Sequence, residues 1–232
     1  MNILVTGADR GLGQGMVKLL LSQGHQVIAG EFCHEWSQLG ELQEAYSDTF
    51  TIIPLDVSSD ESVANARRLV QEKFSLLDVI ISNAGIHKAS PDMNTDYAMM
   101  QNIYNVNAVG PVRVVEAFYD MMKDSDRKEI CLVSSEAGSI SRSWRKGEYG
   151  YCMSKAALNM YGKNLHNRLK PEGYDIRLYY PGWVRSYMAG SLASQGELSI
   201  DEAAQLAIDY FLGTDAEDEL LMVGFDKERW TW

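Results

Sequence analysis

Seven short apolar stretches recur along the 232-residue chain at the length of buried β-strands. They cover residues 3–6, 26–29, 51–55, 79–82, 130–134, 176–180 and 220–223. Between them lie longer segments with apolar residues at helical spacing, such as Leu12, Met16 and Leu19. Alternating strands and helices form right-handed βαβ units, and strands buried on both faces are continuously apolar. The pattern therefore predicts an α/β fold with a doubly wound, seven-stranded parallel sheet and helices on both faces.

Two of the predicted helices are long, at residues 96–123 and 151–169. A later helix begins after Ser199, because Ser199 and Glu202 have the spacing of a capping box. No internal repeat, low-complexity tract or linker interrupts the alternation. We therefore expect residues 1–232 to form a single domain.

The composition is that of an ordinary globular protein, with 46% hydrophobic and 23% charged residues. Its net charge of -11 would repel a phosphate backbone and an anionic membrane, so neither nucleic acid nor a membrane is expected as a partner. Three cysteines without metal-ligand spacing argue against a disulfide framework and a metal site. The chain opens without a basic and apolar leader, so a cytoplasmic protein is expected.

A glycine-rich turn joins the first predicted strand to the first helix. Gly7, Gly11 and Gly13 have the spacing Gly-x-x-x-Gly-x-Gly. Glycines let the backbone turn tightly and approach a pyrophosphate, which free amides at the helix N-terminus can bind. No Lys-Ser or Lys-Thr pair follows, which excludes a P-loop. A turn that merely tolerates glycine is the alternative, but three glycines at this junction favour a dinucleotide site.

The second predicted strand is followed by Glu31, at the distance where an acidic side chain meets the adenosine ribose. A carboxylate there would bind the ribose hydroxyls and repel a 2′-phosphate, which favours NAD. Arg10 in the glycine turn could pair with that phosphate and keeps NADP as the alternative. Glu31 could also be no more than a solvated strand end.

Tyr151 and Lys155 stand four residues apart, on one face of a predicted helix. A phenol with a pKa near ~10 is a poor base at neutral pH unless a cation favours the phenolate, and Lys155 offers that cation. Tyr149 has Met153 at the matching position and cannot take this role. Because such pairs also occur by chance on solvated helices, the pair alone is weak evidence.

Several motifs together resemble the short-chain dehydrogenase/reductase family over residues 1–186. The motifs, in chain order, are Thr6-Gly7-x-x-x-Gly11-x-Gly13, Asn83-Ala84-Gly85, Asn107, Ser134-Ser135, Tyr151-x-x-x-Lys155 and Pro181-Gly182. The resemblance implies a Rossmann-like domain that transfers a hydride between NAD or NADP and an alcohol or carbonyl substrate. A dinucleotide-binding regulatory protein of the same fold without turnover is the alternative, and the intact Tyr151, Lys155 and Asn107 speak against it.

By this resemblance, four residues would carry the catalysis. Tyr151 would exchange a proton with the substrate oxygen, and Lys155 would lower its pKa and hold the nicotinamide ribose. Ser135 would orient the substrate oxygen, and Asn107 would hold a water in the proton relay.

The choice of Ser135 over Ser134 rests on strand alternation, which points neighbouring side chains to opposite faces. Sixteen positions separate Ser135 from Tyr151, a few more than is usual in the family. The usual spacing leads back to Gly138, which has no hydroxyl, so we expect a lengthened loop.

The resemblance also implies a set of cofactor-binding residues. Asp56 and Val57 would lie at the adenine, Asn83 to Gly85 along the adenosine, and Pro181 to Ser186 at the nicotinamide. The full set is Gly7, Arg10, Gly11, Leu12, Gly13, Glu31, Asp56, Val57, Asn83, Ala84, Gly85, Tyr151, Lys155, Pro181, Gly182, Val184 and Ser186.

Substrate recognition is expected in residues 183–197, where Trp183, Tyr187 and Met188 indicate a partly apolar pocket. The loop 139–148 carries Arg142, Arg145 and Lys146, which could recognise an anionic substrate group, contact a partner subunit or simply be solvated.

Two further expectations concern residues outside the catalytic set. His87 is interpreted as an exposed loop histidine without a catalytic role. By similarity to the family, the two long helices are expected to pair with their symmetry mates in a homodimer or homotetramer.

Overall fold

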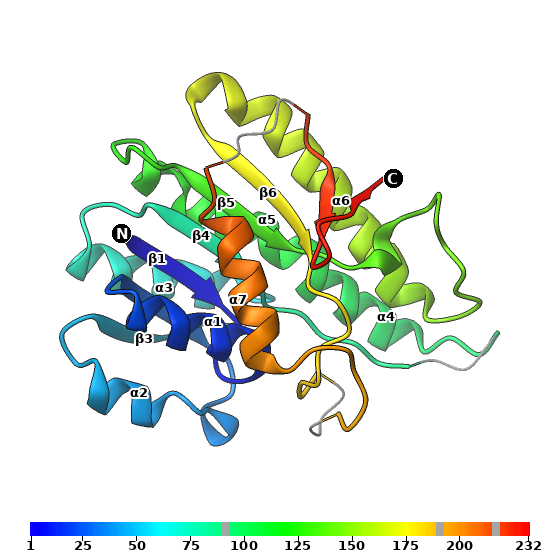
Figure 1. Cartoon of the computed structure of the whole chain (residues 1–232), viewed down its shortest axis with the longest axis horizontal. Helices are drawn as coiled ribbons and strands as arrows, with labels where there is room; N and C mark the ends of the chain where they lie inside the picture. Colours follow the sequence, from blue (N-terminus) through cyan, green and yellow to red (C-terminus); the bar gives the residue numbers. More distant parts are fainter. Residues whose placement is uncertain (90–92, 189–192, 215–218) are drawn as a thin grey trace.

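An eight-stranded sheet forms the centre of the computed structural model, which describes residues 1–89, 93–188, 193–214 and 219–232 (Figure 1). The strands are β1 (Asn2–Thr6), β2 (Gln26–Glu31), β3 (Phe50–Pro54), β4 (Val79–Ser82), β5 (Glu129–Val133), β6 (Asp175–Tyr180), β7 (Met222–Gly224) and β8 (Arg229–Trp230). Their order is β3-β2-β1-β4-β5-β6-β7-β8. The first seven pair in parallel, and β8 pairs antiparallel with β7. The predicted seven-stranded parallel sheet is confirmed, and a short eighth strand is added.

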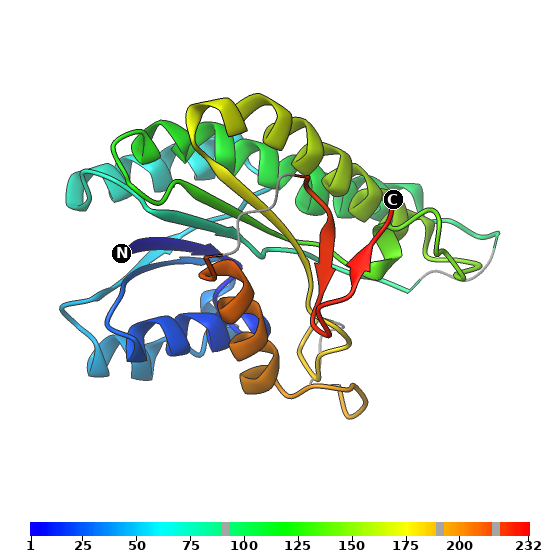
Figure 2. The same ribbon diagram turned by 45° about the horizontal axis from the view of Figure 1, so that its top comes forward.

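Helices cover both faces of this sheet (Figure 2). They are α1 (Gly11–Ser22), α2 (Gly40–Ala45), α3 (Asp60–Lys73), α4 (Tyr97–Tyr104), α5 (Gly110–Phe118), α6 (Tyr149–Leu169) and α7 (Ile200–Phe211). One core lies between the sheet and α3, α5 and α6, and a second lies between the sheet and α1 and α7. Along β1, Leu4 points into the first core and Ile3 and Val5 into the second, as strand alternation requires.

Short helical turns complete the described part of the chain. They are the 3₁₀ turns His34–Trp36, Tyr119–Met122, Glu136–Gly138 and Lys170–Glu172, and the π-helical turn Asn105–Val109. Among the described residues, no helix has the length and apolar character needed to cross a membrane.

The predicted helix over residues 96–123 is interrupted, which corrects the sequence prediction. The π-helical turn separates α4 from α5. Pro111 has no N–H to donate to the carbonyl four residues before it, so the regular α-helical pattern cannot continue there. The wider turn places the buried Asn107 toward the interior of the fold. The second long helix begins two residues earlier than predicted, at Tyr149.

The last helix begins as the sequence predicts. The Ser199 hydroxyl accepts from the Glu202 amide, and the Glu202 carboxylate accepts from the Ser199 amide at 2.8 Å. This capping box satisfies two amides that the helix itself leaves unpaired. Helix α7 then packs against α1, where a Cβ added at Gly15 would lie 2.7 Å from the Ile200 side chain.

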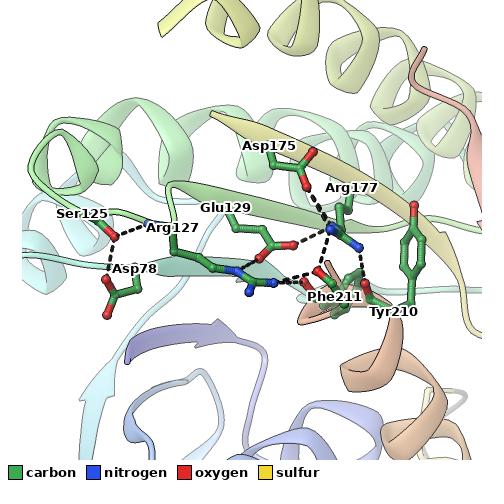
Figure 3. A network of polar contacts seen from close by, with 9 residues as sticks. Asp78, Ser125, Arg127, Glu129, Asp175, Arg177, Tyr210 and Phe211 are labelled. Carbon is green, nitrogen blue, oxygen red and sulfur yellow. Dashed lines mark hydrogen bonds and ion pairs between the residues drawn. The ribbon is translucent and has the colours of Figure 1, made fainter. Parts of the chain in front are cut away.

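A buried ion network holds the other end of α7 (Figure 3). Glu129, whose side chain is 1% exposed, pairs with Arg127 and Arg177 at 2.5 Å each. Both arginines also donate to carbonyls at and beyond the C-terminus of α7, those of Phe211 and Gly213 among them. Cations are favourable at a helix C-terminus. Glu129 opens β5 at the amino edge of the parallel strands, so this network fixes α7 from the edge opposite the strand ends described next.

Candidate active site

The carboxyl ends of β1, β4, β5 and β6 lie side by side in the sheet, and the expected site residues follow them. The glycine turn follows β1, residues 83–85 follow β4, Ser134 and Ser135 follow β5, and Pro181 follows β6. Ligands of open α/β sheets bind at this edge. The sequence motifs therefore meet in one place, although they are spread over some three quarters of the chain.

The glycine turn is shaped for close approach of a ligand. Gly7 and Gly11 both have φ of +61°, a conformation that favours glycine. A Cβ at Gly7 would lie 2.7 Å from the Ala84 backbone, and one at Gly13 would overlap the Gly7 carbonyl. Helix α1 begins here without a side-chain cap, whereas α3, α4 and α7 are each capped by a side chain. The uncapped amides of the first turn are thus available to an anion, and the cradle fits a pyrophosphate.

Two residues hold the turn in place. Asn83 Nδ2 donates to the carbonyls of Thr6 and Gly7, at 3.0 and 2.9 Å. The buried Thr6 hydroxyl accepts from the amides of Asn83 and Ala84, at 3.1 and 3.0 Å. Asn83 therefore supports the turn through its side chain. Sequence reasoning included Thr6 in the motif but missed its role, for which a polar residue at the end of an apolar strand was the available signal.

The residues expected at the adenosine end lie together beyond this turn. The Arg10 guanidinium carbon is 4.4 Å from the centre of the Trp36 ring, and its Nη1 is buried without a hydrogen-bond partner among the described residues. Glu31 ends β2, and its Oε2 is 3.0 Å from His34 Nδ1. One carboxylate and one incompletely paired guanidinium therefore border the region predicted to distinguish NAD from NADP.

The two residues expected at the adenine differ in their availability. Asp56 Oδ1 accepts from the amide and hydroxyl of Ser58, at 2.8 and 2.7 Å, which fixes the carboxylate. Val57 is buried, and a Cβ at Gly110 would lie 2.8 Å from its side chain. The Val57 side chain thus packs in the core, and its contact with an adenine stays a prediction.

The segment expected at the nicotinamide returns to the glycine turn. Gly182 has φ of +77°, and a Cβ there would lie 2.8 Å from the Phe225 ring. Further on, a Cβ at Gly11 would lie 3.5 Å from the Ser186 Cβ. Val184 forms a parallel bridge with Leu198, so the two ends of the predicted substrate segment are joined. Residues 189–192 of that segment lie outside the described residues.

Tyr151 and Lys155 are buried on the same side of α6. Tyr151 is 9% and Lys155 3% exposed, and the Lys155 Nζ lies 5.8 Å from the centre of the Tyr151 ring. Burial raises the pKa of Tyr151 to about 12, against a smaller lowering by a hydrogen bond with Ser135. Loss of solvent outweighs the effect of the nearby groups, and Lys155 is not among the groups that shift this pKa most. The expectation that Lys155 lowers the pKa of Tyr151 stays a prediction.

Lys155 is itself shifted by its surroundings. Burial lowers its pKa to about 8, and its ammonium donates to the Val133 carbonyl at 3.0 Å. A Cβ added at Gly85 would lie 3.8 Å from Lys155 Nζ and 3.4 Å from Asn107 Oδ1. Lys155, Asn107 and the turn after β4 thus converge on one point.

Asn107 has most of its side-chain capacity in use. Its Nδ2 donates to the Ile86 carbonyl at 2.9 Å and to Ser154 Oγ at 3.1 Å, and its Oδ1 accepts from the Ile86 amide at 2.8 Å. One lone pair of Oδ1 remains for a water. The role of Asn107 in a proton relay stays a prediction.

The two serines after β5 point to different partners, as strand alternation predicts. Ser134 Oγ donates to Asn159 Oδ1 at 2.5 Å inside the fold, whereas Ser135 Oγ donates to Glu136 and is among the groups that lower the pKa of Tyr151. Gly138, the position that the usual family spacing indicates, packs on α6 with 2.8 Å between an added Cβ and the Lys155 backbone. No side chain fits at Gly138, and Ser134 points into the fold. Ser135 is therefore the serine after β5 that can supply a hydroxyl to the site.

Sequence reasoning missed a group of charged residues beside Tyr151. The Glu136 carboxylate accepts a hydrogen bond from the Ser135 hydroxyl, and Arg145 forms ion pairs with both Glu136 and Glu148. The His87 ring packs edge-to-face on Tyr151 with 4.8 Å between centres. His87 was expected to be an exposed loop residue, yet its side chain is only 23% exposed and lies 3.2 Å from Glu148.

In the basic loop 139–148, Arg142 and Arg145 form ion pairs within the protein. Arg142 pairs with Glu228 at 2.6 Å and stacks on Trp230, and Arg145 pairs with the two glutamates named above. Within the described part of the chain, Lys146 is the loop cation that makes no ion pair. This arrangement weakens the interpretation of the loop as an anion-recognition element.

Comparisons with known proteins agree with this geometry. The chain matches the short chain dehydrogenase family model over residues 1–197. It is 34% identical over 194 residues to an uncharacterized oxidoreductase of Schizosaccharomyces pombe, covering 82% of this chain and 76% of that protein. It is 31% identical over 183 residues to the 1-hydroxy-2-glutathionyl-2-methyl-3-butene dehydrogenase of Rhodococcus sp. strain AD45, covering 78% and 77%.

Solved structures are similar over the whole length. The NADPH-bound carbonyl reductase from chicken fatty liver has a TM-score of 0.89 and 29% identity, covering 100% of this chain and 98% of that one. The carbonyl reductase Sniffer of Drosophila melanogaster has a TM-score of 0.89 and 26% identity, covering 100% and 99%. With the family model matched over most of its length, the chain belongs to the short-chain dehydrogenase family of NAD(P)-dependent oxidoreductases.

Proposed function

We propose that residues 1–232 form one catalytic domain that transfers a hydride between a nicotinamide dinucleotide and an alcohol or carbonyl substrate. The observation that carries this proposal is the burial of Tyr151 near Lys155 and Ser135, with Ser135 and the glycine turn at the same edge of the sheet. The dinucleotide, when bound, supplies or accepts the hydride at its nicotinamide ring. The carbonyl reductases among the similar structures support this assignment.

Tyr151 moves the proton in this proposal. In reduction its phenol donates to the substrate oxygen, and in oxidation its phenolate takes the alcohol proton. Because burial raises the pKa of Tyr151 to about 12, the phenol keeps its proton at neutral pH. It can therefore act as an acid in carbonyl reduction, the direction that the carbonyl reductases among the similar structures favour. Ser135 orients the substrate oxygen, and Lys155 is held beside the ring by the Val133 carbonyl.

The cofactor would be held along the carboxyl edge of the strands. The amides of residues 11–13 would bind the pyrophosphate, and the Asp56 carboxylate the adenine amine. Asn83, Ala84 and Gly85 would line the adenosine side, and Pro181, Gly182, Val184 and Ser186 the nicotinamide. Leu12 would contribute only its amide, since its side chain packs on the core around α1 and α7.

We propose NAD as the preferred dinucleotide, because Glu31 would repel a 2′-phosphate. Glu31→Ala should raise the affinity for NADPH about tenfold, which corresponds to about 1.4 kcal/mol, and weaken that for NADH. Arg10→Ala should weaken NADPH binding and change NADH binding less, since only the 2′-phosphate would pair with the guanidinium. Tryptophan-quenching titrations with both reduced cofactors measure these affinities.

The matched control for this prediction is Glu35→Ala, because Glu35 is an exposed acid in the 3₁₀ turn that follows Glu31. Its affinities should equal those of the wild type. An unchanged ratio of NADH to NADPH affinity in Glu31→Ala would contradict the assignment of Glu31.

We propose an apolar carbonyl compound as the substrate class. Trp183 is 57% and Met188 46% exposed in the segment after Pro181, so apolar surface is available there. The pairing of Arg142 and Arg145 inside the protein leaves little positive charge for an anionic group. We also propose a cytoplasmic location, since the three cysteines are free thiols.

We propose a homo-oligomer formed through α4 and α6, a homodimer or a homotetramer. Tyr97 and Tyr104 on α4, and Met153 and Met160 on α6, are each seven residues apart and exposed, which gives each helix an apolar stripe. Tyr104→Glu should dissociate the assembly to monomers in light scattering coupled to gel filtration. Ile140→Glu, at an equally apolar exposed loop position, should leave the mass unchanged. A wild-type monomer would contradict this proposal.

The experiment that tests the function begins with titration of the purified protein with NADH and NADPH. A panel of apolar aldehydes and ketones is then assayed with the cofactor that binds more tightly. Turnover with some members of the panel is expected. Tight cofactor binding without hydride transfer to any member would favour the regulatory, non-catalytic alternative.

A further inference from the structure

Glu136 lies directly after the candidate catalytic Ser135 and accepts a hydrogen bond from its hydroxyl. Ser135 Oγ donates to Glu136 Oε2 at 2.5 Å, the short distance typical of a hydroxyl bound to a carboxylate. The Ala137 amide donates to the same Ser135 oxygen at 3.2 Å. Ser135 also caps the 3₁₀ turn Glu136–Gly138, so backbone and side chain together fix its orientation.

A serine hydroxyl has one proton and two lone pairs. The Ser135 hydroxyl donates its proton to the hydrogen bond with Glu136 and accepts from Ala137 with one lone pair, which leaves one lone pair free. Ser135 is also among the groups that lower the pKa of Tyr151. A Tyr151 phenol can donate to that free lone pair. A Tyr151 phenolate would instead need to accept the Ser135 proton, which is already in the hydrogen bond to Glu136. Glu136 and an ionised Tyr151 therefore compete for the hydrogen bond that the Ser135 hydroxyl can donate.

Arg145 holds Glu136 in this position. Its Nε and Nη2 both donate to Glu136 Oε1, the Nε bond at 3.1 Å. Its Nη1 donates to Glu148, whose other oxygen lies 3.2 Å from His87 Nε2. The His87 ring packs on Tyr151. These contacts form a continuous chain of side chains that runs from Tyr151 through His87, Glu148, Arg145 and Glu136 to Ser135.

We propose that Glu136 is a positioning residue that draws the Ser135 proton away from Tyr151 and so keeps Tyr151 in the phenol form, while the Arg145 cation opposes this effect. The proposal rests on the proposed function, in which Tyr151 is the proton donor. Glu136 and Arg145, the two members of one ion pair, therefore have opposite effects on the ionisation of Tyr151.

The charges around Tyr151 have the required signs. Burial raises its pKa most, Ser135 and Arg145 lower it, and Glu136 and Cys152 raise it. The other titratable groups that face it are Lys155, Tyr180, His87 and, through His87, Glu148. Burial acts to raise the pKa of Glu136, but the hydrogen bond from Ser135 and the contacts with Arg145 together lower it below its ordinary value, so Glu136 is a carboxylate at neutral pH.

The test measures kcat/KM for alcohol oxidation against pH, because oxidation requires the phenolate. In Glu136→Gln the midpoint of the rise should move to lower pH by roughly half a unit to one unit, as expected for losing one nearby negative charge. In Arg145→Gln it should move to higher pH by a similar amount. Arg142→Gln is the matched control, since Arg142 lies in the same loop but pairs with Glu228. Its midpoint should equal that of the wild type.

A second readout needs no activity. NMR of tyrosine ¹³Cζ, with the Tyr151 signal assigned through Tyr151→Phe, reports the phenolate fraction in the protein alone. At about pH 11, just above the ordinary pKa of tyrosine, that fraction should fall in the order Glu136→Gln, wild type, Arg145→Gln. Melting temperatures confirm that each variant is folded.

The outcomes separate the two proposals. A wild type without hydride transfer, but with opposite NMR shifts in the two variants, overturns the proposed function and supports the role of Glu136. Turnover in the wild type, with midpoints that coincide or move in the same direction in both variants, overturns the role of Glu136. A merely structural ion pair would lower both rates without separating the midpoints.

Discussion

Tyr151→Phe should lower the rate of hydride transfer by about a thousandfold, the usual range for loss of a general acid. The same variant should bind NADH or NADPH within about twofold of the wild type, because the substitution changes no backbone that faces the cofactor. Such a change is well below the tenfold that about 1.4 kcal/mol would cause. The ring is 9% exposed and packs against His87, and phenylalanine fills the same volume. Only the hydroxyl that exchanges the proton with the substrate oxygen is lost.

Single-turnover stopped flow measures this rate, and tryptophan quenching measures the cofactor affinity. Tyr149→Phe is the matched control on the same helix. The Tyr149 hydroxyl donates to the Lys146 carbonyl at 3.2 Å, and its ring is 36% exposed. Its rate should equal that of the wild type. A Tyr151→Phe variant with wild-type turnover would remove the basis of the proposed mechanism.

Lys155→Met should lower the catalytic efficiency but raise the free energy of unfolding. The catalytic efficiency should fall about a thousandfold, because the cation that supports Tyr151 and the cofactor is lost. The free energy of unfolding at neutral pH should rise by about 2 kcal/mol. Burial lowers the pKa of Lys155 from 10.5 to about 8, and each unit corresponds to about 1.4 kcal/mol. The lost hydrogen bond to the Val133 carbonyl offsets about 1 kcal/mol of this gain.

The sign of this effect depends on pH. Below about pH 8 the lysine is charged in both the folded and unfolded states, and the folded state carries the full cost of burying it. Between about 8 and 10.5 the folded protein holds the neutral amine, so the cost declines. Urea unfolding at pH values on both sides of this window should show the advantage of Lys155→Met shrinking as pH rises.

The control is Lys163→Met, eight residues further along α6. Its ammonium lies 3.9 Å from Glu219 and its side chain is 31% exposed, so its removal should change stability little at either pH. A Lys155→Met protein less stable than the wild type at neutral pH would contradict the cost assigned to the buried lysine.

Much of the fold was predictable because buried parallel strands leave a simple pattern in the sequence. Each of the seven apolar stretches corresponds to a strand, with ends within two residues. Strand β8 was missed because two residues, Arg229 and Trp230, carry no periodic signal. The break between α4 and α5 was missed because its cause, Pro111 after the buried Asn107, lies inside an otherwise regular apolar pattern.

The site was predictable where one motif follows one strand end. The glycine turn, Asn83 and Ser135 all lie where the strand order places them. The contacts of Glu136 with Arg145, and of Glu148 with His87, were not predictable because they depend on how a loop folds back onto the strand ends. The raised pKa of Tyr151 was not predictable because the spacing of Tyr151 and Lys155 contains no information about burial.

The most direct test of the central claim follows the hydride itself. The protein is incubated with C4-deuterated reduced nicotinamide dinucleotide and the apolar carbonyl panel, and the alcohols are analysed by mass spectrometry. One deuterium is expected at the former carbonyl carbon with the wild type and Tyr149→Phe, and almost none with Tyr151→Phe. Deuterium transfer at the wild-type rate by Tyr151→Phe, or its absence from the wild type across the panel despite bound cofactor, would overturn hydride transfer with Tyr151 as the proton donor.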